Sequence, residues 1–76
     1  MENTEIIQSV NAAYDSVNLV NKTILKPVDD KNKKIVKLNI GHLQVMMKKD
    51  FFVEALTANQ KTEIEACIAA GKQYIN

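Results

Sequence analysis

The chain contains no arginine, no tryptophan, a single cysteine and a single histidine among its 76 residues. One cysteine excludes an internal disulfide, and one cysteine with one histidine is too few for a zinc site built from those two residue types. The absence of arginine removes the side chain that most often reads guanine in DNA. A fold of this size therefore depends on helix packing or on association with another chain.

Residues typical of turns are also scarce, since the chain has two glycines and one proline. That is few for an all-β protein, which needs many turns. No run approaches the roughly 18 apolar residues of a membrane-spanning helix, and the first residues lack the pattern of a secretory signal. Hydrophobic residues make up 46% of the chain and charged residues 25%, as in folded proteins. We expect one small domain over residues 1–76, located in the cytoplasm and not in a membrane.

The first predicted helix covers about residues 4–25, where apolar residues recur at spacings of four and three. Asn3 or Thr4 is expected to cap its start, and Pro27 to end it. One interpretation is an ordinary amphipathic helix packed on its own domain. The other is a seam between two copies of the chain, because branched residues recur every seven positions. The self-association face would consist of Ile6, Val10, Ala13, Val17, Val20 and Ile24.

A turn over residues 26–30 precedes the second predicted helix, which covers about residues 31–49. Asp29 or Asp30 is expected to cap it. The branched residues within 33–38 are also compatible with an extended segment, and the sequence leaves this alternative open. Gly41 indicates either close packing at that position or a later start of the helix.

The last part of the chain predicts a short helical piece at 51–56, capped by Asp50, and a third main helix at 58–75. Thr57 and Gln60 have the spacing of a capping box. The fold class is therefore all-α, with three main helices. The predicted core consists of Ile6, Val10, Val17, Val20, Leu43, Met47, Phe51, Phe52, Leu56, Ile64, Cys67 and Ile68.

Candidate chemistry is sparse. Cys67 and His42 are the only thiol and imidazole, and Cys67 falls on the apolar side of the last helix, where it is expected to behave as a small hydrophobe. His42 with Met46 and Met47 has donor types that suit a soft metal ion, but the same pattern is more typical of the edge of a core. No phosphate-binding loop or catalytic motif is present. We expect no enzyme activity, no catalytic residue, no metal and no cofactor.

The net charge of +1 hides an uneven distribution along the chain. Residues 22–49 hold eight lysines against two aspartates, whereas the segments on either side are acidic. Lysines within reach of phosphates would give weak, salt-sensitive binding without sequence preference. The aromatic residues are not interleaved with the lysines, so a hydrated lysine surface is the simpler interpretation. The candidate contacts to an anionic partner are Lys26, Lys31, Lys33, Lys34 and Lys37.

The C-terminal half resembles small uncharacterised proteins encoded by marine bacteriophages. The resemblance is carried by His42-Leu43, Met46-Met47, the segment DFFVEALT and the alanine- and glycine-rich closing helix. It implies a phage accessory or virion-associated protein without enzymatic machinery, acting in the host cytoplasm.

Two functional hypotheses follow. The first is a non-enzymatic interaction or structural accessory protein, phage-encoded, that self-associates into a homo-oligomer through its amphipathic helices or binds a protein partner with them. The alternative is a weak, sequence-independent nucleic-acid-binding module that uses the lysine-rich segment 22–49.

Overall fold

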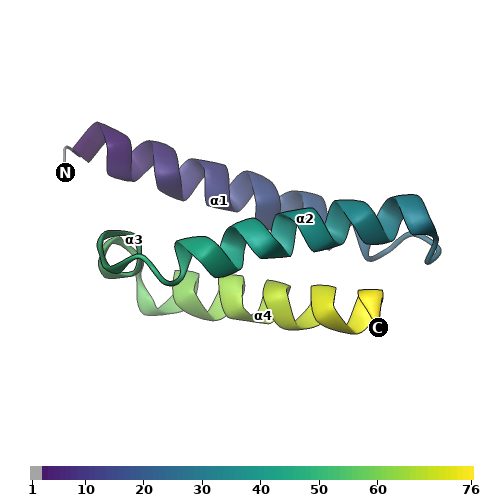
Figure 1. Ribbon diagram of the computed structural model, residues 1–76. Helices are drawn as coiled ribbons and strands as arrows, with labels where there is room; N and C mark the ends of the chain where they lie inside the picture. Colours follow the sequence, from purple (N-terminus) through teal and green to yellow (C-terminus); the bar gives the residue numbers. More distant parts are fainter. Residues whose placement is uncertain (1–2) are drawn as a thin grey trace.

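A computed structural model describes residues 3–76 as four helices connected by short turns, with no strand in that range. The helices are α1 (Asn3–Thr23), α2 (Asp30–Met46), α3 (Asp50–Ala55) and α4 (Ala58–Ile75). The three long helices alternate in direction: α2 runs antiparallel to both α1 and α4, as Figure 1 shows. The predicted all-α fold with three main helices and one short helical piece is therefore confirmed.

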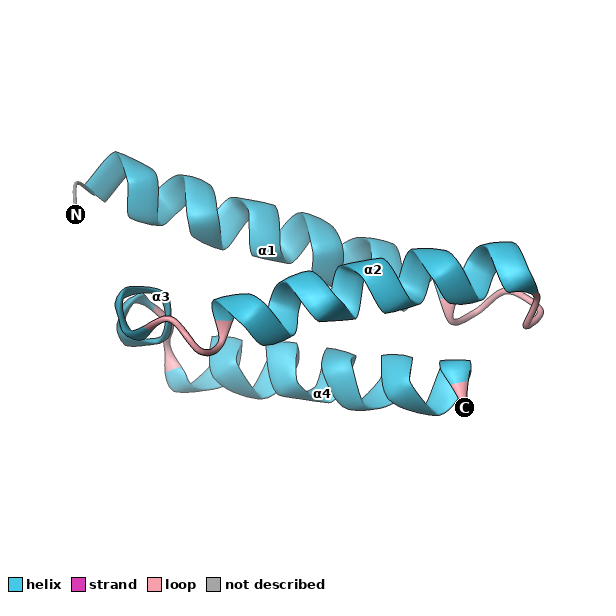
Figure 2. Cartoon of the chain, viewed as in Figure 1, coloured by secondary structure: helices cyan, strands magenta, loops and turns pink. Residues whose placement is uncertain are grey.

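Helix α2 lies between the other two long helices and packs against both α1 and α4 (Figure 2). The short helix α3 lies at the end of the bundle away from the α1–α2 turn, where it packs on α1. The bundle is elongated, with extents of 40 × 19 × 17 Å. One long side of α2 is left without a neighbour in this arrangement, a point that matters for the candidate site.

Helix α1 ends at Thr23, two residues before the predicted boundary. The Thr23 hydroxyl donates a hydrogen bond to the Leu19 carbonyl at 2.7 Å, and the Lys26 amide donates to the Thr23 carbonyl at 2.9 Å. The chain turns there because Pro27 disfavours helical geometry just before it. At the other end, Asn3 and Thr4 both lie inside the helix, so the prediction that one of them caps it is wrong.

Helix α2 begins with Asp29 as its N-cap, as one of the two predicted alternatives has it. The Asp29 carboxylate accepts a hydrogen bond from the Asn32 amide at 2.7 Å. Residues 33–38 are helical, which settles the alternative of an extended segment. Val36 is buried in the core and lies close to Gly71 of α4, and that burial outweighs the β preference of the branched residues.

The end of α2 was predicted at Lys49, but the helix stops at Met46. Lys49 has extended backbone angles and is itself the N-cap of α3, without a side-chain hydrogen bond. Asp50 therefore does not cap α3 as predicted. It lies in the first turn, where its negative charge interacts favourably with the positive end of the helix dipole.

The predicted capping box starts α4. The Gln60 amide donates to the Thr57 hydroxyl at 3.1 Å, and the Thr57 amide donates to the Gln60 side chain at 2.9 Å. At the other end of α4 the Tyr74 hydroxyl lies 3.1 Å from the Lys26 carbonyl and 2.9 Å from the Pro27 carbonyl. These contacts tie the end of α4 to the α1–α2 turn.

The core lies between the three long helices and is closed at one end by Phe52 of α3. Seven predicted core residues are buried, namely Val17, Val20, Leu43, Phe52, Leu56, Ile64 and Cys67. Four more are partly buried against the core, namely Val10, Met47, Phe51 and Ile68. Ile6 is only half-buried, near the free end of α1. Ala13, Val36, Ile40 and Met46 are buried core residues that the prediction left out.

The two glycines occupy very different surroundings. A Cβ atom placed on Gly71 would lie 2.6 Å from Cγ2 of Ile40 and 3.1 Å from Cγ1 of Val36, so α4 approaches α2 closely there. A Cβ atom placed on Gly41 would meet nothing within 4 Å. Neither reason predicted for Gly41 holds, because it is not closely packed and α2 begins well before it.

Candidate functional site

The predicted self-association face lies largely inside the folded chain. Ala13, Val17 and Val20 are buried in the core, and Val10 and Ile24 pack against it. The Cys67 thiol of α4 lies 3.8 Å from the Val17 carbonyl, in hydrogen-bonding position, so α4 covers the middle of this stripe. Helix α1 therefore uses most of these residues for packing within the chain, whereas Ile6 is only half-buried.

The thiol and the imidazole are not brought together. Cys67 is buried, and burial raises the pKa of its thiol above the ordinary value, which keeps the sulfur protonated at neutral pH. His42 is exposed on α2, whereas Met46 is in the core and Met47 is half-buried. Within residues 3–76 no group of three or more histidine, cysteine or acidic side chains is placed to hold a metal ion.

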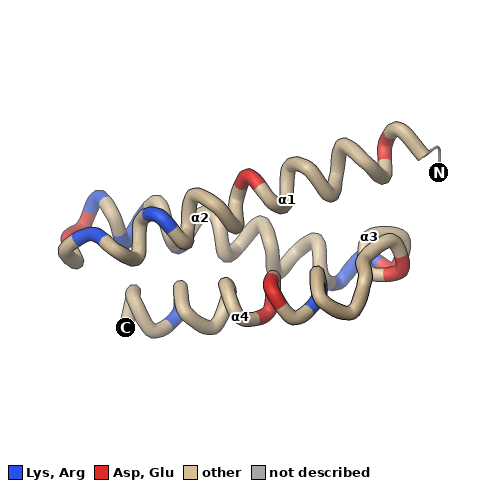
Figure 3. Tube along the Cα trace, turned by 180° about the vertical axis from the view of Figure 1, so that it is seen from behind, with Lys and Arg blue, Asp and Glu red and all other residues tan. Residues whose placement is uncertain are grey.

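The five predicted lysine contacts do not form one cluster. Lys31, Lys33, Lys34 and Lys37 lie on the first half of α2, and Lys26 lies in the preceding turn. Figure 3 shows this concentration of lysines at one end of α2 and the acidic positions on α1. Successive residues of a helix are 100° apart, so these four α2 lysines point in different directions. Only part of the set can engage one ligand.

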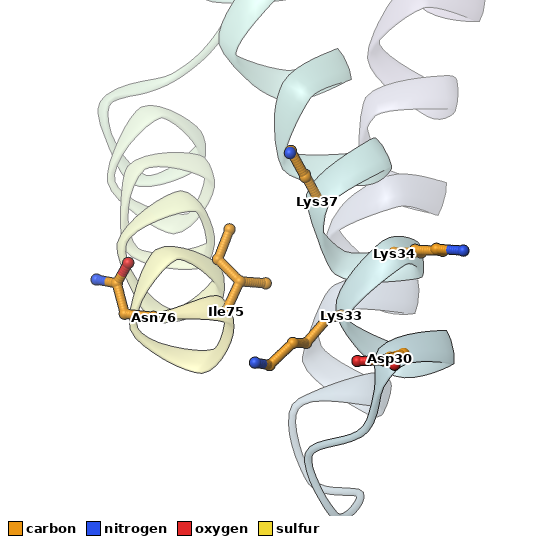
Figure 4. A pocket seen from close by; sticks show the side chains of 6 residues that line it. All are labelled: Asp30, Lys33, Lys34, Lys37, Ile75 and Asn76. Atoms are coloured by element: carbon orange, nitrogen blue, oxygen red, sulfur yellow. The ribbon is translucent and has the colours of Figure 1, made fainter.

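A pocket of about 380 Å³ lies between the start of α2 and the end of α4. Its lining consists of Asp30, Lys33, Lys34, Lys37, Ile75 and Asn76. Figure 4 shows Lys33 and Lys37 on the side of α2 that faces α4, whereas the Lys34 side chain extends away from α4. Two of the predicted lysines thus share this pocket, and Lys34 belongs to the neighbouring surface of α2.

A second pocket, of about 480 Å³, lies between the same two helices toward their other ends. Its lining consists of Gln44, Met47, Lys48, Glu65, Ile68 and Lys72. The sequence did not predict that Lys72 lines a pocket, because the predicted lysine contacts all lay in the segment 22–49. The signal was present, because residues 65, 68, 72 and 75 follow the spacing of three and four that places them along one side of α4.

The surface of α2 opposite the core carries apolar side chains in contact with solvent. Leu38 is 76% exposed and Val45 is 56% exposed, and these two residues are seven positions apart. Lys31, Lys34 and His42 are also exposed and fall on the same side of the helix at spacings of three and four. We call these five residues the outer face of α2. The sequence did not predict this face, because Leu38 and Val45 are only two apolar residues, whereas α1 carries a longer apolar stripe.

Tyr14 lies at the rim between α1 and α4. Loss of hydration, with a smaller contribution from the Glu63 carboxylate, raises the pKa of its phenol above the ordinary value of 10.0. Tyr14 is a marker of the α1–α4 contact, since Glu63 belongs to α4.

Comparison with known proteins identifies no relatives: no family model, no curated protein and no solved structure matches the chain. The resemblance to marine bacteriophage proteins therefore stays a prediction. None of the helices within residues 3–76 is both long enough and apolar enough to cross a membrane.

Proposed function

We propose that this protein is a non-enzymatic interaction protein that binds an acidic amphipathic helix of a partner on the outer face of α2. The observation that supports the proposal is the exposure of Leu38 and Val45 on the side of α2 opposite the buried core. Two apolar anchors seven residues apart match the way in which an amphipathic helix lies along another helix. Burying them would remove from water the two large apolar side chains that α2 exposes.

The charged side chains around Leu38 and Val45 favour an acidic partner. The outer face contributes Lys31, Lys34 and His42 and no acidic side chain. A partner helix with carboxylates beside its apolar residues would meet Lys31 and Lys34 with opposite charge, which favours encounter and orientation. The apolar area is small, so the complex is expected to be weak and reversible.

A second copy of the chain fits this face less well. Helix α2 holds four lysines and one aspartate, so two copies pressed together along it would bring like charges close. The predicted homo-oligomer remains a proposal, but the buried part of the α1 stripe is an unsuitable interface because it would have to leave the core. Binding of an acidic partner requires no such rearrangement.

The experiment is a titration of the protein with a synthetic helical peptide carrying leucines seven residues apart and flanking glutamates, followed by fluorescence anisotropy. Replacing both anchors, Leu38→Ser with Val45→Ser, should weaken binding by about tenfold or more, since burying one aliphatic side chain contributes about 1.5–3 kcal/mol. Ile7→Ser is the matched control because Ile7 is an exposed aliphatic residue of α1, at 57% exposure.

A peptide with lysines in place of the glutamates should not bind to the unmodified protein. Equal affinity for the acidic and basic peptides would contradict the electrostatic part of the proposal. Unchanged affinity of the double serine variant would contradict the location of the site.

The second candidate function is weak nucleic-acid binding through lysines, and the observation that favours it is the pair Lys33 and Lys37 in one pocket. Retention on a heparin or DNA column that falls steeply with salt would support it. Passage through the column without retention at low salt would eliminate it.

A further inference from the structure

We infer that the two pockets between α2 and α4 are the ends of one basic groove that binds the phosphate backbone of a nucleic-acid duplex. This inference rests on the second candidate function and specifies its site. We call the surface the α2–α4 groove and define it by Lys33, Lys37, Lys48 and Lys72.

The helical positions place both pockets on the same side of the α2–α4 pair. On α2, the residues at 33, 37 and 44 fall within one narrow sector when successive residues are 100° apart, and Lys48 follows in the turn after the helix. On α4, residues 65, 68, 72 and 75 do the same. Both pockets take part of their lining from these positions. The opposite side of the pair is the core, which faces α1. The two hollows therefore follow each other along the outer edge where α2 meets α4.

The groove has the length and charge for a phosphate backbone. Along α2 the lining runs from Lys33 to Gln44, 11 residues, which corresponds to about 16 Å at 1.5 Å per residue. That length matches about five nucleotides of one strand at 3.4 Å each. The two linings hold five lysines, Lys34 included, against two acidic residues, Asp30 and Glu65, so the net charge of the lining is positive.

The apolar part of the lining favours a duplex over a single strand. It consists of Met47, Ile68 and Ile75 and contains no aromatic ring. Proteins that bind single strands stack bases on aromatic side chains, and each stacked base contributes substantially to affinity. Tyr74 lies in the last turn of α4, but its hydroxyl donates hydrogen bonds to the Lys26 and Pro27 carbonyls. The remaining attraction is electrostatic and increases with the phosphate density of the ligand.

The test is the salt dependence of binding to a fluorescent 20-base-pair DNA duplex, measured by anisotropy between 50 and 200 mM salt. Four phosphate contacts predict a slope of about −3.6 in log K against log salt, or about a 150-fold loss of affinity over this range. The variant Lys37→Gln with Lys72→Gln should retain a slope of about −1.8, or about a 12-fold loss over the range. Its affinity at 50 mM salt should also be lower than that of the unmodified protein.

The matched control is Lys22→Gln with Lys31→Gln. It removes the same charge from exposed positions on α1 and on the outer face of α2, and it should keep the slope of the unmodified protein. Circular dichroism of both double variants should show an unchanged melting curve, because the exchanged side chains carry their charges in solvent. Single-stranded DNA of the same sequence and inorganic polyphosphate should bind more weakly than the duplex.

The outcomes distinguish nucleic-acid binding itself from its location in the α2–α4 groove. No salt-sensitive binding of any nucleic acid would eliminate the second candidate function together with the groove. Binding whose slope falls equally in both double variants would retain nucleic-acid binding and overturn the groove as its site. Stronger binding of polyphosphate or of the single strand would overturn the assignment to a duplex.

Discussion

Replacing each glycine by alanine should have opposite effects on stability, and the pair tests how closely α2 and α4 approach. At Gly41 a methyl group would enter open space in the interior of α2. Alanine there should stabilise the protein by up to about 1 kcal/mol, the difference in helix propensity between the two residues. No packing cost opposes this gain.

At Gly71 the same methyl group would lie 2.6 Å from Cγ2 of Ile40, closer than two such carbons approach in folded proteins. Ile40 and Val36 are both buried, so neither can move without displacing other core residues. Overpacking of this kind costs about 1–3 kcal/mol, against the gain of about 1 kcal/mol in helix propensity. We expect Gly71→Ala to be destabilising by up to about 2 kcal/mol.

Urea unfolding monitored by circular dichroism measures both effects. The two variants should differ by about 1–3 kcal/mol, which for a slope near 1 kcal/mol/M is a difference of about 1–3 M in their midpoints. Adding Ile40→Ala removes the atom that clashes, so in that background Gly71→Ala should no longer destabilise. Equal stabilisation by Gly41→Ala and Gly71→Ala would refute the close contact of the two helices.

Three further predictions concern individual side chains. Thr57→Ala should lower the free energy of unfolding by about 0.5–2 kcal/mol, measured by urea unfolding, because it removes the hydroxyl that accepts from the Gln60 amide; no loss would mean that the cap is not formed. The absorbance titration of Tyr14 should lie above pH 10.0, the ordinary pKa, and move partly back in Glu63→Gln. Since the pKa of Tyr14 is raised in the folded state, the contribution of its neutral phenol to the free energy of unfolding is complete below pH 10 and is lost as the pH rises through the pKa of the folded protein. A Tyr14 titration at its ordinary pKa would refute the burial at the α1–α4 rim. Cys67 should react with a thiol reagent at neutral pH only after unfolding, because it is buried and its pKa is raised; rapid reaction in the native protein would contradict its place in the core.

Local sequence signals predicted much of the fold. The spacing of apolar residues along α1 and the capping box at Thr57 and Gln60 depend on residues close in sequence, and both recur in the structure. The helix boundaries near Thr23 and Met46 were less accurate, because the chain leaves a helix where tertiary packing and turns compete with propensity. The choice of Met46 over Met47 as the buried residue likewise depends on the rotation of α2 against its neighbours.

The candidate surfaces were harder to predict because they depend on which faces remain uncovered. The α1 stripe has the pattern of an interface, and the same pattern serves an internal core equally well. Lys72 joins Lys37 along one groove only because α4 runs antiparallel to α2, which no local motif encodes. The exposed Leu38 was visible as an apolar residue, but its exposure follows from the absence of a fourth long helix against α2.

A nuclear magnetic resonance titration of isotope-labelled protein with the acidic helical peptide, following the backbone amides, locates the docking surface directly. If the partner docks on the outer face of α2 and the α1 stripe is internal, the amides around Leu38, His42 and Val45 should shift most, whereas those of Ala13 and Val17 should stay in place. Shifts concentrated on Ala13 and Val17, or no shifts at millimolar peptide, would contradict docking on the outer face of α2.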